Sequence, residues 1–157
     1  MFPNYIDYTK CIKHWNQRKM KPVLYIVLHN TAASVSSALS WFENPKSKVS
    51  AHYIMGRDGT AYLTVNEENV AWHAGNSFIN WNSIGIEIEA TANDRGLTQP
   101  QEECLIKLIN NLKLKYDVPI WNLMLHRWAK TNTDCPTLVW STDDDFIHWR
   151  QRCFELK

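Results

Sequence analysis

The stretch VLYIVLH, residues 23–29, decides the fold, because it sets a continuous apolar run directly before a histidine. Six apolar residues in succession, Val23 to Leu28, are typical of a strand that is covered on both faces. His29 then stands at the carboxyl end of the strand, at the rim of the expected sheet. A rigid rim holds a side chain in a fixed direction, so this segment predicts a buried sheet with a functional residue at its edge.

The segments that follow predict a helix and a hairpin. Val35, Ala38, Leu39 and Phe42 fall at helical spacing, and Asn44-Pro45 ends that helix. Residues 51–56 and 60–65 have the character of strands, and the Asp-Gly pair between them is a hairpin signal because glycine tolerates positive φ.

A third strand is predicted by SIGIEIE, residues 83–89, in which polar and apolar residues alternate. Its three isoleucines share one face, and Gly85, Glu87 and Glu89 share the other. Gly85 has no side chain, so we expect it to leave room for a ligand to approach the strand beside Glu87.

The carboxyl-terminal half predicts helices packed on this sheet. Thr98 and Gln101 form a capping-box pattern before a helix that extends to about Lys115. A short strand at residues 123–125 leads to His126, and the acidic residues 143–145 suit the beginning of a last helix. The sequence therefore predicts an α/β (α+β) fold, a central mixed sheet flanked by helices, in a single domain over residues 1–157.

The composition excludes several classes of function. The formal net charge is +1, which gives no electrostatic reason to expect a nucleic acid or an anionic membrane as partner. The first residues lack the apolar core of a signal peptide, and no apolar run is long enough to span a bilayer. The four cysteines have no zinc-ribbon spacing, so we expect free thiols.

Two histidines and one cysteine are candidate metal ligands. His29 and His126 each follow an apolar strand, and Cys135 lies nine residues after His126 in the loop TNTDCP. Two imidazoles and a thiolate leave a fourth position of zinc for water, which is the pattern of a catalytic site. Zinc would lower the pKa of that water from about 16 to about 7. The alternative is a globular domain with scattered histidines and no metal.

Five segments resemble one known family when they are taken together and in order: VLHNTAAS, SAHYIMGRDGTAYLTV, VAWHAGNS, NSIGIEIEA and LHRWAKTNTDCP. They are similar to the zinc amidases that include phage amidase lysozymes, bacterial muropeptide amidases and animal peptidoglycan-recognition proteins. The resemblance covers residues from about 23 to 138. It implies zinc-dependent hydrolysis of the amide bond between N-acetylmuramic acid and L-alanine in peptidoglycan.

The resemblance assigns the central residues of the site. The zinc ligands fall on His29, His126 and Cys135, with Asp134 as the rival for the third position. The catalytic carboxylate of the bacterial branch falls on Glu87, which would take a proton from water and pass it to the leaving amine. A solvent-facing carboxylate is the alternative for Glu87.

The resemblance also implies residues near the substrate. His73 matches a position beside the substrate cleft, and packing against Trp72 is the alternative. Asn30 and Thr31 follow the first ligand, where they could contact the substrate or support the metal site.

Three positions depart from the family pattern. Thr133 stands where many members have a lysine that stabilises the oxyanion, and Lys130 is the alternative donor in the same loop. Ala51 stands where the phage branch has a tyrosine, which shifts the catalytic burden to Glu87. Thr137 replaces the glycine that commonly follows the Cys-Pro pair.

The expected setting is that of a phage-type endolysin, a monomer whose partner is peptidoglycan or a muropeptide. We expect no separate cell-wall-binding domain and no stable association with a membrane. Without a signal peptide, the enzyme would stay in the host cytoplasm until lysis and act on the wall after release. The alternatives are a cytoplasmic muropeptide-recycling amidase and a module that binds peptidoglycan without cutting it.

Overall fold

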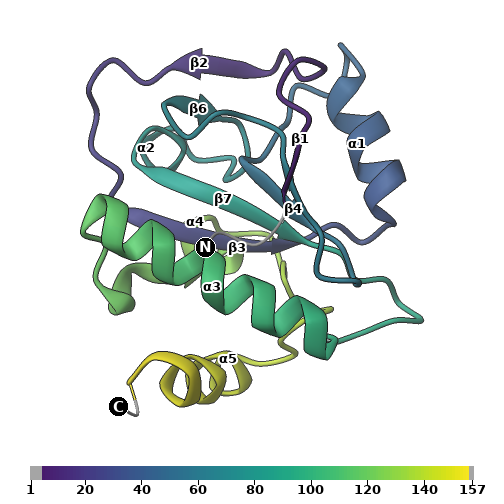
Figure 1. Cartoon of the computed structure of the whole chain (residues 1–157), viewed down its shortest axis with the longest axis vertical. Helices are drawn as coiled ribbons and strands as arrows, with labels where there is room; N and C mark the ends of the chain where they lie inside the picture. The colour runs from purple at the N-terminus through teal and green to yellow at the C-terminus, as the bar shows by residue number, and fades with distance from the viewer. Residues whose placement is uncertain (1–4, 156–157) are drawn as a thin grey trace.

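A six-stranded mixed sheet forms the centre of the molecule in the computed structural model, which describes residues 5–155 (Figure 1). The strands are β1 Tyr5–Asp7, β2 Trp15–Gln17, β3 Tyr25–Asn30, β4 Tyr53–Met55, β5 Ala61–Leu63, β6 Asn69–Ala71, β7 Ser83–Ile88 and β8 Leu123–Leu125. The helices are α1 Val35–Glu43, α2 Ser77–Trp81, α3 Gln99–Tyr116, α4 His126–Ala129 and α5 Asp143–Arg150, with short turns η1 Ile120–Asn122 and η2 Gln151–Glu155. The predicted α/β fold with a mixed sheet and flanking helices is confirmed.

The order of strands in the sheet is β1-β5-β4-β7-β3-β8, and β2 and β6 form a separate antiparallel pair. β3 runs parallel to both β7 and β8. His29 pairs with Glu87 across β3 and β7, and Leu28 pairs with Leu125 across β3 and β8. His29 is therefore inside the strand rather than after it, because the pairing with β7 continues to Asn30.

The two faces of the sheet carry different residues, as the alternation in residues 83–89 predicts. The three isoleucines of β7 are fully buried in the larger hydrophobic core, which α3 and α5 cover. Figure 1 shows α3 lying across the sheet, with α5 beyond it. On the other face α1 packs Ala38, Leu39 and Phe42 against Ala51 and Ile54. His29 and Glu87 belong to this second face, since their side chains alternate with the buried isoleucines.

The helix ends agree with their sequence signals. The predicted capping box is present at α3: the Thr98 side chain accepts from the backbone N–H of Gln101, and the Gln101 side chain accepts from the backbone N–H of Thr98. α5 has a second capping box, between Thr142 and Asp145, where the sequence predicted only acidic residues. The hairpin turn between β4 and β5 has Gly59 at a φ of 84°.

The short strands β1 and β2 at the amino terminus were not predicted. β1 pairs with β5 and β2 with β6, and a buried arginine holds the segment after β2. Arg18 is only 6% exposed, and its guanidinium donates to the backbone oxygens of Glu67, Asn69, Trp81 and Ser83. One side chain thus ties the segment after β2 to β6, to α2 and to the beginning of β7.

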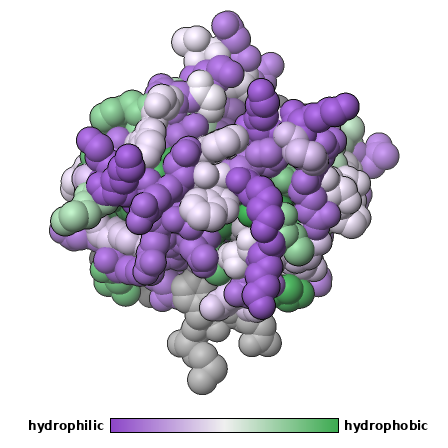
Figure 2. Space-filling model, turned by 90° about the horizontal axis from the view of Figure 1, so that it is seen from above, coloured by the Kyte–Doolittle hydropathy of each residue, from purple (hydrophilic) through white to green (hydrophobic). Residues whose placement is uncertain are grey.

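The surface is largely polar on the face shown in Figure 2, where apolar residues stand in small separate groups. Scattered apolar side chains of this kind need no partner. Within residues 5–155, no helix combines the length and the apolar character that crossing a bilayer would require.

We expect Thr98→Ala to lower the free energy of unfolding by about 1 kcal/mol, since it removes the acceptor of the α3 capping box. Thr98→Ser keeps the hydroxyl and should stay close to wild type. Urea unfolding followed by circular dichroism measures both. Equal stability of Thr98→Ala and wild type would show that the cap does not stabilise α3.

Candidate metal centre

A cleft of about 380 Å³ opens between the second face of the sheet and α1. It lies where β3, β7 and β8 end, which is the edge at which parallel sheets commonly bind ligands. All eight residues that the sequence predicts for the site line this one cleft: His29, Asn30, Thr31, His73, Glu87, His126, Thr133 and Cys135. The structure therefore brings together residues that are up to 106 positions apart in the chain.

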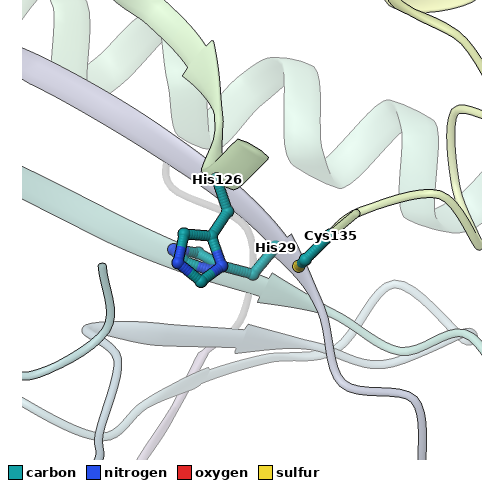
Figure 3. A group of neighbouring side chains, drawn as sticks. All are labelled: His29, His126 and Cys135. Atoms are coloured by element: carbon teal, nitrogen blue, oxygen red, sulfur yellow. The ribbon is translucent and has the colours of Figure 1, made fainter. Parts of the chain in front are cut away.

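The three predicted metal ligands converge in this cleft (Figure 3). His29 comes from β3, His126 from the first position after β8, and Cys135 from the loop beyond α4. One nitrogen of each imidazole and the thiol sulfur all lie within 4.8 Å of one another. Among residues 5–155 this is the one such group of at least three His, Cys, Asp or Glu side chains. The rival Asp134 is exposed and is not part of it.

Burial keeps both histidines neutral. It lowers the pKa of His29 well below its usual range, with a further contribution from His126, and it also lowers the pKa of His126. Neutral imidazole is the form that binds a metal, so protons do not compete at neutral pH. Two neutral imidazoles and one sulfur within reach of a single ion fit the preferences of zinc.

The Cys135 thiol depends on its surroundings for its charge. Burial and the neighbouring Glu87 raise its pKa to about 12, while a hydrogen bond from the backbone N–H of Asn30, with N to Sγ at 3.3 Å, acts in the opposite direction. A bound divalent cation removes the proton from a coordinating thiol. The loop thus suits a thiolate only when a cation is present.

Glu87 has the properties of a proton carrier. Its Oε2 is buried and has no hydrogen-bond partner within the described part of the chain. Burial raises its pKa to about 7. A carboxyl group with this pKa both accepts and donates a proton readily near neutral pH. The solvent-facing alternative for Glu87 does not match this environment.

The two candidate oxyanion donors differ in position. Thr133 lines the cleft, and its Oγ1 accepts a hydrogen bond from the backbone N–H of Cys135 at 3.3 Å, which leaves the hydroxyl proton available to donate. Lys130 is exposed and packs on Gly75, where a Cβ atom would lie 2.7 Å from its Nζ. Of these two residues, Thr133 is the one that lines the cleft.

Asn30 and Thr31 line the cleft, and the side-chain oxygen of each has a protein partner. The Asn30 Oδ1 accepts from the backbone N–H of Leu138 at 3.2 Å, and its own N–H points to Cys135. The Thr31 hydroxyl donates to the carbonyl of Ala33. Of the two roles that the sequence left open for these residues, support of the site fits these contacts better.

Gly85 requires a correction to the expectations, whereas His73 lines the cleft as expected and has ring contacts that the sequence did not predict. Both ring nitrogens of His73 have protein partners, His29 and Ser83, each at 3.0 Å, so neither is free for a substrate. The space beside Gly85 is not open to a ligand, because a Cβ atom there would lie 2.5 Å from Cγ of His73. Sequence reasoning missed Ser83 altogether, since a serine that begins a strand carries no signal of its own.

Comparison with known proteins places the chain in a family of amidases. Residues 19–138 match the family described as N-acetylmuramoyl-L-alanine amidase. Over 72 residues the chain is 40% identical to N-acetylmuramoyl-L-alanine amidase A of Achromobacter lyticus, a match that spans 45% of this chain and 40% of that protein.

Solved structures have the same fold. A mutant endolysin from Bacillus subtilis superposes with a TM-score of 0.72 at 23% identity, over 96% of this chain and 97% of that one. The N-acetylmuramyl-L-alanine amidase AmiD from E. coli, in complex with the substrate anhydro-N-acetylmuramic acid-L-Ala-D-γ-Glu-L-Lys, has a TM-score of 0.61 at 25% identity. That match covers 69% of this chain and 50% of AmiD.

The raised pKa of Glu87 predicts a pH-dependent cost in stability for the metal-free protein. Its folded-state pKa of about 7 exceeds the ordinary 4.5, so the contribution of Glu87 is most favourable at low pH and is lost as pH rises through about 7. As pH rises from 5 to 8, we expect the free energy of unfolding of Glu87→Gln to increase by about 2 kcal/mol relative to that of wild type. Urea unfolding in chelator measures this, with the exposed Glu103→Gln as control. A constant difference between Glu87→Gln and wild type would contradict it.

Proposed function

The chain belongs to the N-acetylmuramoyl-L-alanine amidase family, and we propose that it hydrolyses the bond between N-acetylmuramic acid and L-alanine with the help of a zinc ion. The observation that carries this proposal is the convergence of His29, His126 and Cys135 within 4.8 Å of one another in the cleft. These three residues would hold the ion. When bound, zinc supplies a Lewis acid that polarises a carbonyl group and lowers the pKa of water toward about 7.

Glu87 moves the proton in this proposal. Its carboxylate takes one proton from the attacking water, whose oxygen forms the new bond to the carbonyl carbon. The bond between that carbon and the alanine nitrogen then breaks, and Glu87 delivers the same proton to the departing amine. A pKa of about 7 suits both steps, because the group must be a base first and an acid afterwards.

Thr133 stabilises the negative charge that develops on the carbonyl oxygen. Its hydroxyl lies in the cleft with its oxygen already held by the N–H of Cys135, so its proton is free to donate. A neutral donor forms a weaker hydrogen bond than the ammonium group of a lysine would.

The lining of the cleft suits a sugar-containing substrate. It includes Glu87 but no lysine or arginine among the described residues, so no cationic side chain in the lining pairs with an anionic group. Trp41 and Trp72 line the cleft, and Trp41 is 53% exposed. An exposed indole face packs well against the apolar face of a sugar ring. The peptidoglycan fragment bound by AmiD contains such a sugar ring.

We further propose that the substrate is the intact wall, as for an endolysin that acts after release from the host cytoplasm. The likeness of fold to the Bacillus subtilis endolysin along nearly the whole of both chains supports this. A recycling amidase is the alternative, since AmiD binds an anhydro-muropeptide. A module that only binds peptidoglycan is disfavoured, because the chain keeps three candidate ligands and a buried carboxyl group beside them.

The purified protein should release amino termini of L-alanine from peptidoglycan sacculi, and a chelator should abolish this release until zinc is added back. We expect Glu87→Gln to lower the rate by about 10²- to 10⁴-fold while it retains zinc, because only the proton transfer is lost. Glu103→Gln, an exposed glutamate on α3, should match wild type.

The same assay with soluble anhydro-muropeptides separates the two settings. Faster cleavage of sacculi supports the endolysin, whereas activity on soluble fragments alone supports recycling. Binding to sacculi without cleavage would contradict the proposed hydrolysis and indicate a module that only binds peptidoglycan. Near-normal activity of Glu87→Gln would assign the proton transfer to another group.

Removal of the thiol should release the metal. We expect Cys135→Ala to fall well below one zinc per chain in elemental analysis, because two imidazoles alone bind zinc weakly. Asp134→Ala changes the adjacent residue, which is exposed, and should keep wild-type zinc. Zinc retained in Cys135→Ala but lost in Asp134→Ala would identify Asp134 as the third ligand.

A further inference from the structure

The hydrogen bonds behind His29 form a chain in which the position of each proton can be assigned. The Ser83 Oγ lies 2.6 Å from the carbonyl oxygen of Ile79. A carbonyl only accepts, so the single proton of the Ser83 hydroxyl points to Ile79. The Ser83 Oγ also lies 3.0 Å from Nε2 of His73, and there it must accept. Nε2 of His73 therefore has a proton.

The assignment continues from His73 to His29. His73 is buried, and its two ring partners, His29 and Ser83, offer no carboxylate to balance a positive charge, so the ring is neutral and has one proton. That proton is on Nε2, which leaves a lone pair on Nδ1. Nδ1 of His73 lies 3.0 Å from Nε2 of His29, so His29 is the donor. Nδ1 of His29 is then the atom with a free lone pair.

The same loop orients the second histidine. Nε2 of His126 lies 3.1 Å from the carbonyl oxygen of Ala74, the residue after His73, so it donates and leaves its own Nδ1 with a lone pair. The Asn80 Oδ1 accepts from the backbone N–H groups of both His73 and Ala74, at 3.2 and 2.7 Å. A single dipeptide, itself held by Asn80, thus contacts both imidazoles.

Gly85 makes this arrangement possible. The His73 ring lies across β7 at residue 85, where a Cβ atom would approach Cγ of His73 to 2.5 Å. Any larger residue would push the ring away from His29 or from Ser83.

We propose that Ser83 and His73 are positioning residues that hold His29 in the tautomer with its proton on Nε2, so that Nδ1 is the atom offered to the metal. The carbonyl of Ala74 has the same function for His126. A histidine binds a metal through the ring nitrogen that has no proton. Loss of the hydrogen bonds from Ser83 through His73 to His29, here called the relay, should therefore weaken metal binding. The inference rests on the proposed function for the identity of the metal, whereas the tautomer exists without one.

The test uses Ser83→Ala, Ser83→Thr and Ser50→Ala. Ser50 is a matched control, since it is a buried serine that donates to the carbonyl of His14 and accepts from the N–H of Trp72 without contacting a ring of the relay. Zinc affinity is measured by competition with a chromophoric chelator. The tautomer of His29 in the metal-free protein is read from ¹⁵N–¹H correlations of its ring.

We expect Ser83→Ala to weaken zinc binding by about 10- to 100-fold and to give His29 a mixture of tautomers. Ser83→Thr should restore both properties, and Ser50→Ala should leave both unchanged even if it lowers the melting temperature. Wild-type zinc affinity in Ser83→Ala, or a proton on Nδ1 of His29 in the wild type, would overturn the relay. A wild-type chain with the expected tautomer but no affinity for zinc would instead overturn the proposed function and leave the relay supported.

Discussion

The parallel pairing of β3 with β7 and β8 is the constraint on which the rest of the structure depends. Parallel strands bring their carboxyl ends to one edge, and this register sets His29 beside Glu87 and His126 just beyond β8. Side chains alternate along a strand, so a slip of one residue would turn His29 and Glu87 into the hydrophobic core and the isoleucines into the cleft. The core under α3 and α5 therefore also determines where the reactive groups point.

Burial in the cleft has opposite effects on the two kinds of titratable group, and both suit the proposed chemistry. A weakly polar environment disfavours charge of either sign, so it lowers the pKa of the histidines and raises that of Glu87 to about 7. The imidazoles remain neutral ligands, while the carboxyl group can gain and lose a proton. A single physical cause thus suits both the proposed metal ligands and the proposed proton carrier.

Residues without reactive groups of their own hold those that have them. Asn30 contacts the loop of Cys135 through its backbone N–H and its side chain, and Asn80 holds the dipeptide that faces both histidines. Gly85 contributes only the absence of a side chain, which the ring of His73 fills. These contacts join β3, β7 and the loops before and after them, so the site is a property of the whole edge of the sheet.

The sequence by itself determined the parts that local patterns encode: the apolar run before His29, the alternation that places Glu87 on the face opposite the isoleucines, the Thr98 capping box and, through resemblance, Cys135. Only the tertiary structure decided which protein groups His73 contacts, that Ser83 belongs to the site, and that Gly85 makes room for a ring rather than a ligand. The physical reason is the separation along the sequence of the residues that each interaction joins. Periodicity and capping depend on neighbours within a few residues, whereas a hydrogen bond between His29 and His73 joins segments 44 residues apart and exists only when the sheet has brought them together.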